Sequence, residues 1–269
     1  MKKSHVAIIM LSSLGLQCSL KRAEGQVINI KSGQLTNETV LIVINGESNA
    51  GGQVPNSGAT QSELAPRPAF QILNNTNLTF EDLHIGVNNN IGHQGLQNGL
   101  THGFELELAN RADTNAFYAK PCYLVKTGQG GSVIDQWRVG QPYFTTFLKR
   151  VGSAKKLLKG KPYRTVIIFS LGINDAIAST DIKFWKASVK KHFVNMRKAL
   201  GPDTPIIMTK IMPVFKVYNQ AIEQIAKEVP NVYVVNTADA TQADPYHWDY
   251  NGMKLIGSRM FTIVESMKK

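Results

Sequence analysis

The stretch VLIVINGESNAGG at residues 40–52 decides how the rest of the chain is organised. Its first half, residues 40–45, is a continuous apolar run rich in β-branched residues, which is typical of a strand buried on both faces. Its second half breaks into glycines and small polar residues around Ser48. A buried strand that stops there places one hydroxyl at the end of a sheet, where small neighbours let a substrate come close. Ser48 is therefore a candidate nucleophile, although a turn with a polar tip fits this stretch equally well by itself.

Further apolar runs alternate with helix-like segments along the rest of the chain. Strands are predicted at residues 122–126, 165–170, 205–212 and 232–236, with a short leading strand at 26–30. Helices are predicted at residues 105–111, 143–158, 181–200, 217–229 and 251–267. Because the strands are apolar runs rather than alternations, the pattern predicts an α/β fold with a mostly parallel five-stranded sheet covered on both faces. The polar stretch 51–99 is expected to form a long loop along one wall of a cleft.

The N-terminus has the pattern of a secretory signal peptide. Lys2 and Lys3 precede a short apolar run at residues 6–11, which is too short for an ordinary membrane span. We expect cleavage near Ala23, so that residues 1–24 form the signal and residues 25–269 form one domain of a secreted or periplasmic protein. A lipoprotein anchor at Cys18 is a less favoured alternative, because Gln17 replaces the small residue expected before it.

The formal net charge of +11 bears on partners. A basic secreted protein suits an acidic polysaccharide, but solubility alone is the favoured explanation of the charge. No long run of Lys and Arg indicates nucleic acid, and no cysteine or histidine cluster has metal-ligand spacing. The sequence does not indicate an oligomeric state.

Four breaks that follow predicted strands carry small or polar residues. They are the residues around Ser48, the turn with Gly130 and Gly131, the stretch GIND at 172–175, and the stretch DPYH at 244–247. In open α/β sheets the crevice beyond these strand ends is where ligands bind. Each break alone is an ordinary turn or helix cap. Their conjunction, in this order, indicates catalysis.

Acyl transfer needs a nucleophile, a base, an orienting group for the base and donors for the developing oxyanion. Asp244 and His247 are one turn apart, so the carboxylate can meet one imidazole nitrogen while the other nitrogen faces Ser48. The backbone N–H groups of Ser48 and Gly130 and the side-chain amide of Asn174 are candidate oxyanion donors.

These blocks resemble those of the SGNH (GDSL-like) hydrolase superfamily. The stretch GESNAG at residues 46–51 is similar to the Gly-Gln-Ser-Asn block of the sialate O-acetylesterase-like branch, also called carbohydrate esterase family 6. Gly130, Gly131 and Ser132, with Trp137 downstream, are similar to its glycine block, and the stretch HGFE that ends at Glu105 resembles its Gly-Pro-Glu stretch. The resemblance runs from about residue 40 to the C-terminus.

The resemblance implies a flavodoxin-like three-layer α/β/α fold and a serine esterase without metal or cofactor, acting on an acetylated carbohydrate. It places Ser48, Gly130 and Asn174 at the oxyanion and completes the triad with Asp244 and His247. The further candidates for substrate binding or tuning are Glu47, Gly131, Trp137 and Glu105.

Two departures from the branch stand out. Glu47 replaces its usual Gln, and is expected either to raise the pKa of His247 or to face away into a salt bridge with a basic side chain and anchor the turn. The stretch LGIND at 171–175 is closer to the general SGNH block than to the branch's Gln-Gly-Glu-Ser-Asp form. Two alternatives therefore stay open beside the carbohydrate esterase: a lipase or thioesterase on the same scaffold, and a carbohydrate-binding relative without turnover.

Overall fold

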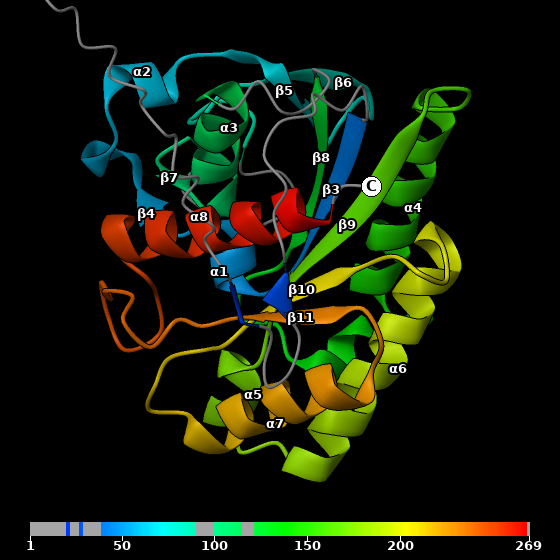
Figure 1. Cartoon of the computed structure of the whole chain (residues 1–269), viewed down its shortest axis with the longest axis vertical. Helices are drawn as coiled ribbons and strands as arrows, with labels where there is room; N and C mark the ends of the chain where they lie inside the picture. The colour runs from blue at the N-terminus through cyan, green and yellow to red at the C-terminus, as the bar shows by residue number, and fades with distance from the viewer. Residues whose placement is uncertain (1–19, 22–26, 29–38, 90–98, 115–120, 268–269) are drawn as a thin grey trace, which may run out of the picture. The chain divides into compact units, whose positions relative to one another are not determined.

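The computed structural model describes residues 20–21, 27–28, 39–89, 99–114 and 121–267 (Figure 1). The chain divides into two compact units, Met1–Gly33 and Gln34–Lys269. In the first unit, β1 (Leu20–Lys21) pairs antiparallel with β2 (Val27–Ile28). The predicted signal peptide, residues 1–24, lies outside the described residues except for β1. Cys18 also lies outside them.

The second unit is built on a seven-stranded sheet with the order β11-β10-β9-β3-β8-β5-β6. Its strands are β3 (Thr39–Gly46), β5 (Arg67–Leu73), β6 (Phe80–Leu83), β8 (Cys122–Gly128), β9 (Tyr163–Ser170), β10 (Ile206–Thr209) and β11 (Val232–Val235). All neighbouring strands run parallel except β5 and β6. The predicted α/β class with a mostly parallel sheet is confirmed, with seven strands instead of five.

The two additional strands come from the polar stretch that was expected to be a loop. β5 pairs parallel with β8 through Phe70 and Ile72, and β6 pairs antiparallel with β5 at the edge of the sheet. Phe70, Ile72, Leu73 and Leu83 are fully buried. The same stretch holds α2 (Gln61–Leu64) and the short strand β4 (Val54–Pro55), which pairs antiparallel with β7 (Thr101–His102). Several of its apolar residues therefore reach the core, whereas Val87 is exposed.

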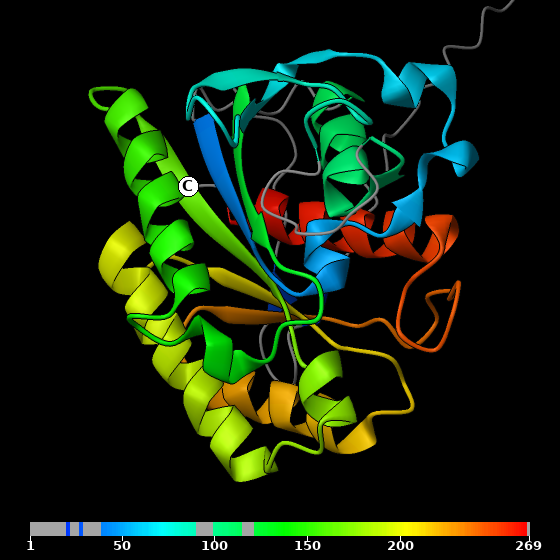
Figure 2. The same cartoon turned by 180° about the vertical axis from the view of Figure 1, so that it is seen from behind.

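Helices cover both faces of the sheet, giving three layers (Figures 1 and 2). One face carries α4 (Pro142–Leu157), α6 (Ile182–Leu200) and α7 (Lys216–Glu228). The other face carries α3 (Phe104–Thr114) and α8 (Tyr250–Ser266), which pack against each other. Within the described ranges, no helix is both long and apolar enough to span a bilayer.

Helix α6 shows how the sequence sets these elements. Its buried residues Trp185, Val189, Phe193 and Met196 recur every three or four positions and form one stripe toward the sheet. The Asp181 side chain caps the helix by accepting the Phe184 N–H at 2.8 Å, and Gly201 ends it.

Candidate active site

Ser48 lies at the carboxyl end of the central strand. β3 ends at Gly46, and Ser48 begins the one-turn helix α1 (Ser48–Gly51). The strands that flank β3 are β9 and β8, so the loops after these strands open beside it, where ligands of such sheets bind. Gly46 has φ +142°, and a Cβ there would lie 1.9 Å from the Ser170 carbonyl oxygen. A glycine is therefore needed for this close approach of the chain to β9.

The structure brings the three predicted triad residues together in one hydrogen-bonded chain. His247 Nε2 lies 3.2 Å from Ser48 Oγ, and His247 Nδ1 lies 2.8 Å from Asp244 Oδ2. The Asp244 carboxylate also accepts the backbone N–H groups of Tyr246 at 2.7 Å and His247 at 2.9 Å. Burial alone would raise the pKa of Asp244, but the hydrogen bonds from His247 and from these N–H groups outweigh it and hold the pKa below its usual range.

The loop that carries Asp244 and His247 is closed on itself. The Ala243 N–H donates to the His247 carbonyl at 2.9 Å, and Thr241 Oγ1 donates to Asp249 Oδ1 at 2.5 Å. Asp249 in turn caps α8 by accepting the Gly252 N–H at 2.8 Å. His247 and Asp244 are thus held in a short hydrogen-bonded loop before α8, although the His247 side chain remains 27% exposed.

Asn49, for which the sequence predicted no role, follows Ser48 in the chain and is hydrogen-bonded to this loop. It is fully buried, and its Nδ2 donates to the Tyr246 carbonyl at 3.0 Å while its Oδ1 accepts the Trp248 N–H at 3.4 Å. One amide beside Ser48 therefore holds the residues on both sides of His247. The pattern gave no signal for this role, because the partners are about two hundred residues away in sequence.

Glu47 points away from the solvent and toward the start of α5 (Ile173–Ile177). It is fully buried, and its carboxylate accepts the backbone N–H groups of Gly172, Ile173 and Asn174 at 2.9, 2.8 and 3.0 Å. The Asn174 side-chain Nδ2 donates to it as well. Burial raises the pKa of Glu47 to about 7 although the four hydrogen bonds oppose the change. Among the described residues the donors to Glu47 are all neutral amides, so the expected salt bridge is not formed there, and hydrogen bonds alone anchor the turn.

The predicted glycine turn is tied to the end of β3. The Gln129 N–H donates to the Gly46 carbonyl at 2.8 Å, and the turn with Gly130 and Gly131 closes when Ser132 Oγ donates to the Gln129 carbonyl at 2.7 Å. Gly131 has φ +73°, which favours glycine. Trp137 is buried, and its indole N–H donates to Ser132 Oγ at 3.0 Å. The structure thus places Trp137 behind the turn, where it fixes Ser132.

Glu105 also lies beneath the surface. It forms an ion pair with Lys126 at 2.8 Å, and both side chains are fully buried. Its carboxylate further accepts the Asn89 side chain and the Gly103 N–H, each at 2.9 Å. The Gly103 backbone packs against Gly52, where a Cβ would meet it at 2.8 Å. Glu105 therefore supports the loop behind α1, and the structure does not bring it to Ser48.

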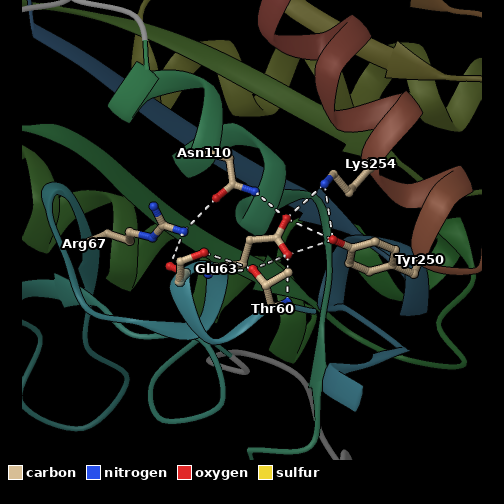
Figure 3. A network of polar contacts seen from close by, with 7 residues as sticks. Thr60, Glu63, Arg67, Asn110, Tyr250 and Lys254 are labelled. Atoms are coloured by element: carbon tan, nitrogen blue, oxygen red, sulfur yellow. Dashed lines mark hydrogen bonds and ion pairs between the residues drawn. The ribbon is translucent and has the colours of Figure 1, made fainter. Parts of the chain in front are cut away.

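A second polar network fixes the start of α8 (Figure 3). Glu63 accepts the Tyr250 hydroxyl at 2.8 and 2.9 Å, Lys254 Nζ at 2.9 Å and Asn110 Nδ2 at 3.1 Å. Burial would raise the pKa of Glu63, but hydrogen bonds from Thr60, Lys254 and Tyr250 outweigh it and lower the pKa to about 2. Tyr250 is the first residue of α8, three positions after His247. The network thus joins α2, α3 and α8 next to the triad loop.

The described residues contain no group of three or more His, Cys, Asp or Glu side chains that could hold a metal ion. Independently of any metal, the site places the Ser48 hydroxyl, the His247 imidazole and the Asp244 carboxylate in line. This arrangement suits nucleophilic acyl transfer.

Comparisons with known proteins bear on this geometry. A family model described as carbohydrate esterase, sialic acid-specific acetylesterase, matches residues 38–266. A search of curated proteins gave no match. A solved structure of a protein from Arabidopsis thaliana aligns with a TM-score of 0.70 and 19% identity, over 86% of this chain and 99% of its own.

Two further solved structures align over most of this chain. NanS aligns with a TM-score of 0.64 and 14% identity, over 85% of this chain and 97% of its own. A carbohydrate acetylesterase from Xanthomonas citri aligns with a TM-score of 0.54 and 13% identity, over 83% of this chain and 55% of its own. At these identities the three structures show a shared fold.

Proposed function

The chain belongs to the sialic acid-specific acetylesterase family of carbohydrate esterases, and we propose that it removes acetyl groups from a carbohydrate with Ser48 as its nucleophile. The resemblance to that branch of the SGNH hydrolases is confirmed by the family match, and the chain is accordingly a carboxylic ester hydrolase. The observation that carries the proposed mechanism is the chain of contacts from Ser48 Oγ through His247 to Asp244, at 3.2 and 2.8 Å.

Acylation begins with His247 as the base. Its Nε2 takes the hydroxyl proton while Ser48 Oγ attacks the ester carbonyl carbon, and Asp244 stabilises the imidazolium that forms at Nδ1. The tetrahedral intermediate then collapses, and His247 returns the proton to the departing sugar oxygen. The acetyl group remains on Ser48 until water, deprotonated by His247, attacks it and releases acetate.

The oxyanion of each tetrahedral intermediate needs donors that are already in place. The backbone N–H groups of Ser48 and Gly130 and the side-chain amide of Asn174 are the proposed donors. An amide nitrogen carries two hydrogens. Since one hydrogen of Asn174 Nδ2 is directed to Glu47, the second is left for the oxyanion.

The test is release of acetate from a panel of O-acetylated sugars, including neutral, uronate-bearing and sialic acids. Wild type should release acetate from at least one of them. Ser48→Ala should lower kcat on the order of 10⁶-fold while remaining folded, since loss of a triad nucleophile leaves only the contribution of the oxyanion hole and binding. Near-wild-type turnover by purified Ser48→Ala would overturn the mechanism.

The panel also separates the alternatives. A lipase or thioesterase on this scaffold would prefer long-chain acyl esters or acyl thioesters to acetylated sugars. A carbohydrate-binding relative without turnover would bind the sugars and release no acetate. The continuous hydrogen-bonded triad favours the hydrolase over the binding protein.

We also propose that the enzyme is secreted or periplasmic, on the basis of the basic and apolar N-terminal pattern. The N-terminal sequence of the mature protein, isolated from its native cells, tests this. A start near residue 24 would support it, and an intact Met1 in a cytoplasmic fraction would contradict it.

A further inference from the structure

The two departures of this sequence from the carbohydrate-esterase blocks contact each other. Glu47 stands where the branch usually has Gln, and Asn174 lies in the stretch that differs from the branch's Gln-Gly-Glu-Ser-Asp form. The two residues are 127 positions apart, yet the Asn174 amide donates directly to the Glu47 carboxylate. The two positions at which this sequence departs from the branch are therefore hydrogen-bonded to each other.

The hydrogen bonds divide unevenly between the two carboxylate oxygens. Glu47 Oε1 accepts the backbone N–H groups of Gly172 and Ile173 at 2.9 and 2.8 Å. Among the described residues, Glu47 Oε2 accepts hydrogen bonds from Asn174 alone, through the backbone N–H at 3.0 Å and through the side-chain Nδ2. One oxygen thus fixes the backbone of the turn, and the other fixes the side chain of the proposed oxyanion donor.

Only a carboxylate can accept all four of these donors. A glutamine has one acceptor oxygen and an NH₂ group that donates. If that oxygen accepts the Gly172 and Ile173 N–H groups, the NH₂ faces two donors on Asn174. The Asn174 side chain must then turn to offer its Oδ1, which moves its Nδ2 away from the place where it now points.

We propose that Glu47 is a positioning residue that holds the Asn174 amide with one hydrogen on the carboxylate and the other directed at the oxyanion. This rests on the proposed function, because it takes Asn174 to be an oxyanion donor. Glu47 itself touches neither substrate nor the reacting atoms, since its side chain is fully buried under the turn. Its effect on catalysis passes through Asn174.

The test is a double-mutant cycle of Glu47→Gln and Asn174→Ala, with kcat and KM measured on one soluble acetyl ester at a pH above 7, where Glu47 is ionised. Loss of one oxyanion donor typically lowers kcat roughly 10²–10³-fold, so we expect that range for Asn174→Ala and about 10–10²-fold for Glu47→Gln. KM should change little in both, because the contact strengthens in the transition state. In the Asn174→Ala background, Glu47→Gln should cost less than about threefold, because its target is gone.

Thr209→Val is the control for a general loss of rigidity at the carboxyl ends of the strands. It removes a buried hydrogen bond from Thr209 to Ser170 Oγ, at 2.9 Å, without touching Glu47. Its effect should be the same in the wild-type and Asn174→Ala backgrounds. If Glu47→Gln does not fold, Glu47→Asp is the second variant: it keeps the charge but is about 1.5 Å shorter, and should show the same non-additivity.

Equal losses from the Glu47 substitution in both backgrounds would overturn the positioning role, and so would an unchanged kcat in Glu47→Gln. A failure of the proposed function has a different signature. In that case Ser48→Ala or Asn174→Ala alone keeps wild-type turnover, whatever Glu47 does.

Discussion

Two fully buried glutamates support the nucleophile loop, and they differ in what faces them. Glu105 has a buried cationic partner, Lys126, at 2.8 Å. Burial alone would raise the pKa of Glu105, but Lys126 and the hydrogen bonds from Asn89 and Gly103 lower it. Glu47 has neutral donors only, and burial raises its pKa to about 7. Equal burial therefore gives opposite shifts, and the sign depends on the cation.

The difference assigns distinct tasks to the two carboxylates. Glu105 stays ionised over the ordinary pH range and acts as a permanent support for the loop that meets Gly52. Glu47 changes its charge near neutral pH, directly beside Ser48 and beneath Asn174. Glu105 should therefore stabilise the fold at all ordinary pH values. Glu47 should make both stability and activity depend on pH near neutrality.

The largest expected loss of stability comes from breaking the Glu105–Lys126 ion pair. Lys126→Met leaves the Glu105 charge buried without its partner, which should lower the free energy of unfolding by about 3–5 kcal/mol in urea titrations at pH 7. The control is the double variant Glu105→Gln/Lys126→Met, which removes both charges and should regain most of the loss. A single variant as stable as wild type would remove the distinction between the two glutamates.

The second effect concerns the pH dependence of stability at Glu47. Its pKa is about 7 in the folded protein, whereas an exposed glutamate has an ordinary value of 4.5. The folded state therefore holds a proton that the unfolded chain has released between these values. The contribution is present in full below about pH 4.5 and is lost as pH rises through 7, by up to about 3 kcal/mol.

Urea titrations of wild type and Glu47→Gln from pH 4.5 to 7.5 measure this contribution. The stability of wild type relative to Glu47→Gln should fall across that range. The double variant Glu105→Gln/Lys126→Met should show no such trend there, because the lowered pKa of Glu105 places its transition at more acidic pH and no unpaired lysine is left buried. Parallel curves for wild type and Glu47→Gln would show that Glu47 does not titrate in this window.

The smallest loss of stability is expected for the substitution of Asn49, which is buried and uncharged. Asn49→Ala removes the two hydrogen bonds that hold Tyr246 and Trp248, and should cost about 1–3 kcal/mol with no pH dependence of its own. We also expect kcat to fall about tenfold, since a shift of about 1 Å in a reacting group can cost up to about 10²-fold. Unchanged kcat on a soluble acetyl ester would reduce Asn49 to a purely structural residue.

Local pattern was enough to predict the central strands and the five long helices. β3 and β9 are uninterrupted apolar runs, and α6 has a clear stripe, so each element carries its own signal. β5 and β6 do not. β6 is the edge strand and β5 lies next to it, and both come from a polar stretch in which few side chains reach the core. The short helix α5 likewise has too few residues to show a period.

The candidate site was predictable where function leaves its mark on residue type. Ser48, Asp244 and His247 follow predicted strands and are the residue types that acyl transfer uses, and the structure brings them together. The roles of Asn49 and Glu47 depend on contacts across more than a hundred residues, which no local pattern encodes. Glu105 and Trp137 matched family blocks, yet their side chains are buried, which residue type alone does not reveal.

Covalent labelling of Ser48 tests the proposed mechanism most directly. A fluorophosphonate reacts with a serine only when a base and oxyanion donors activate it, so wild type at neutral pH should gain one adduct by intact-mass spectrometry, located on the peptide that contains Ser48. Folded Ser48→Ala should gain none. An adduct on another serine, or an unlabelled wild type that still hydrolyses acetyl esters, would contradict the assignment of Ser48 as the nucleophile.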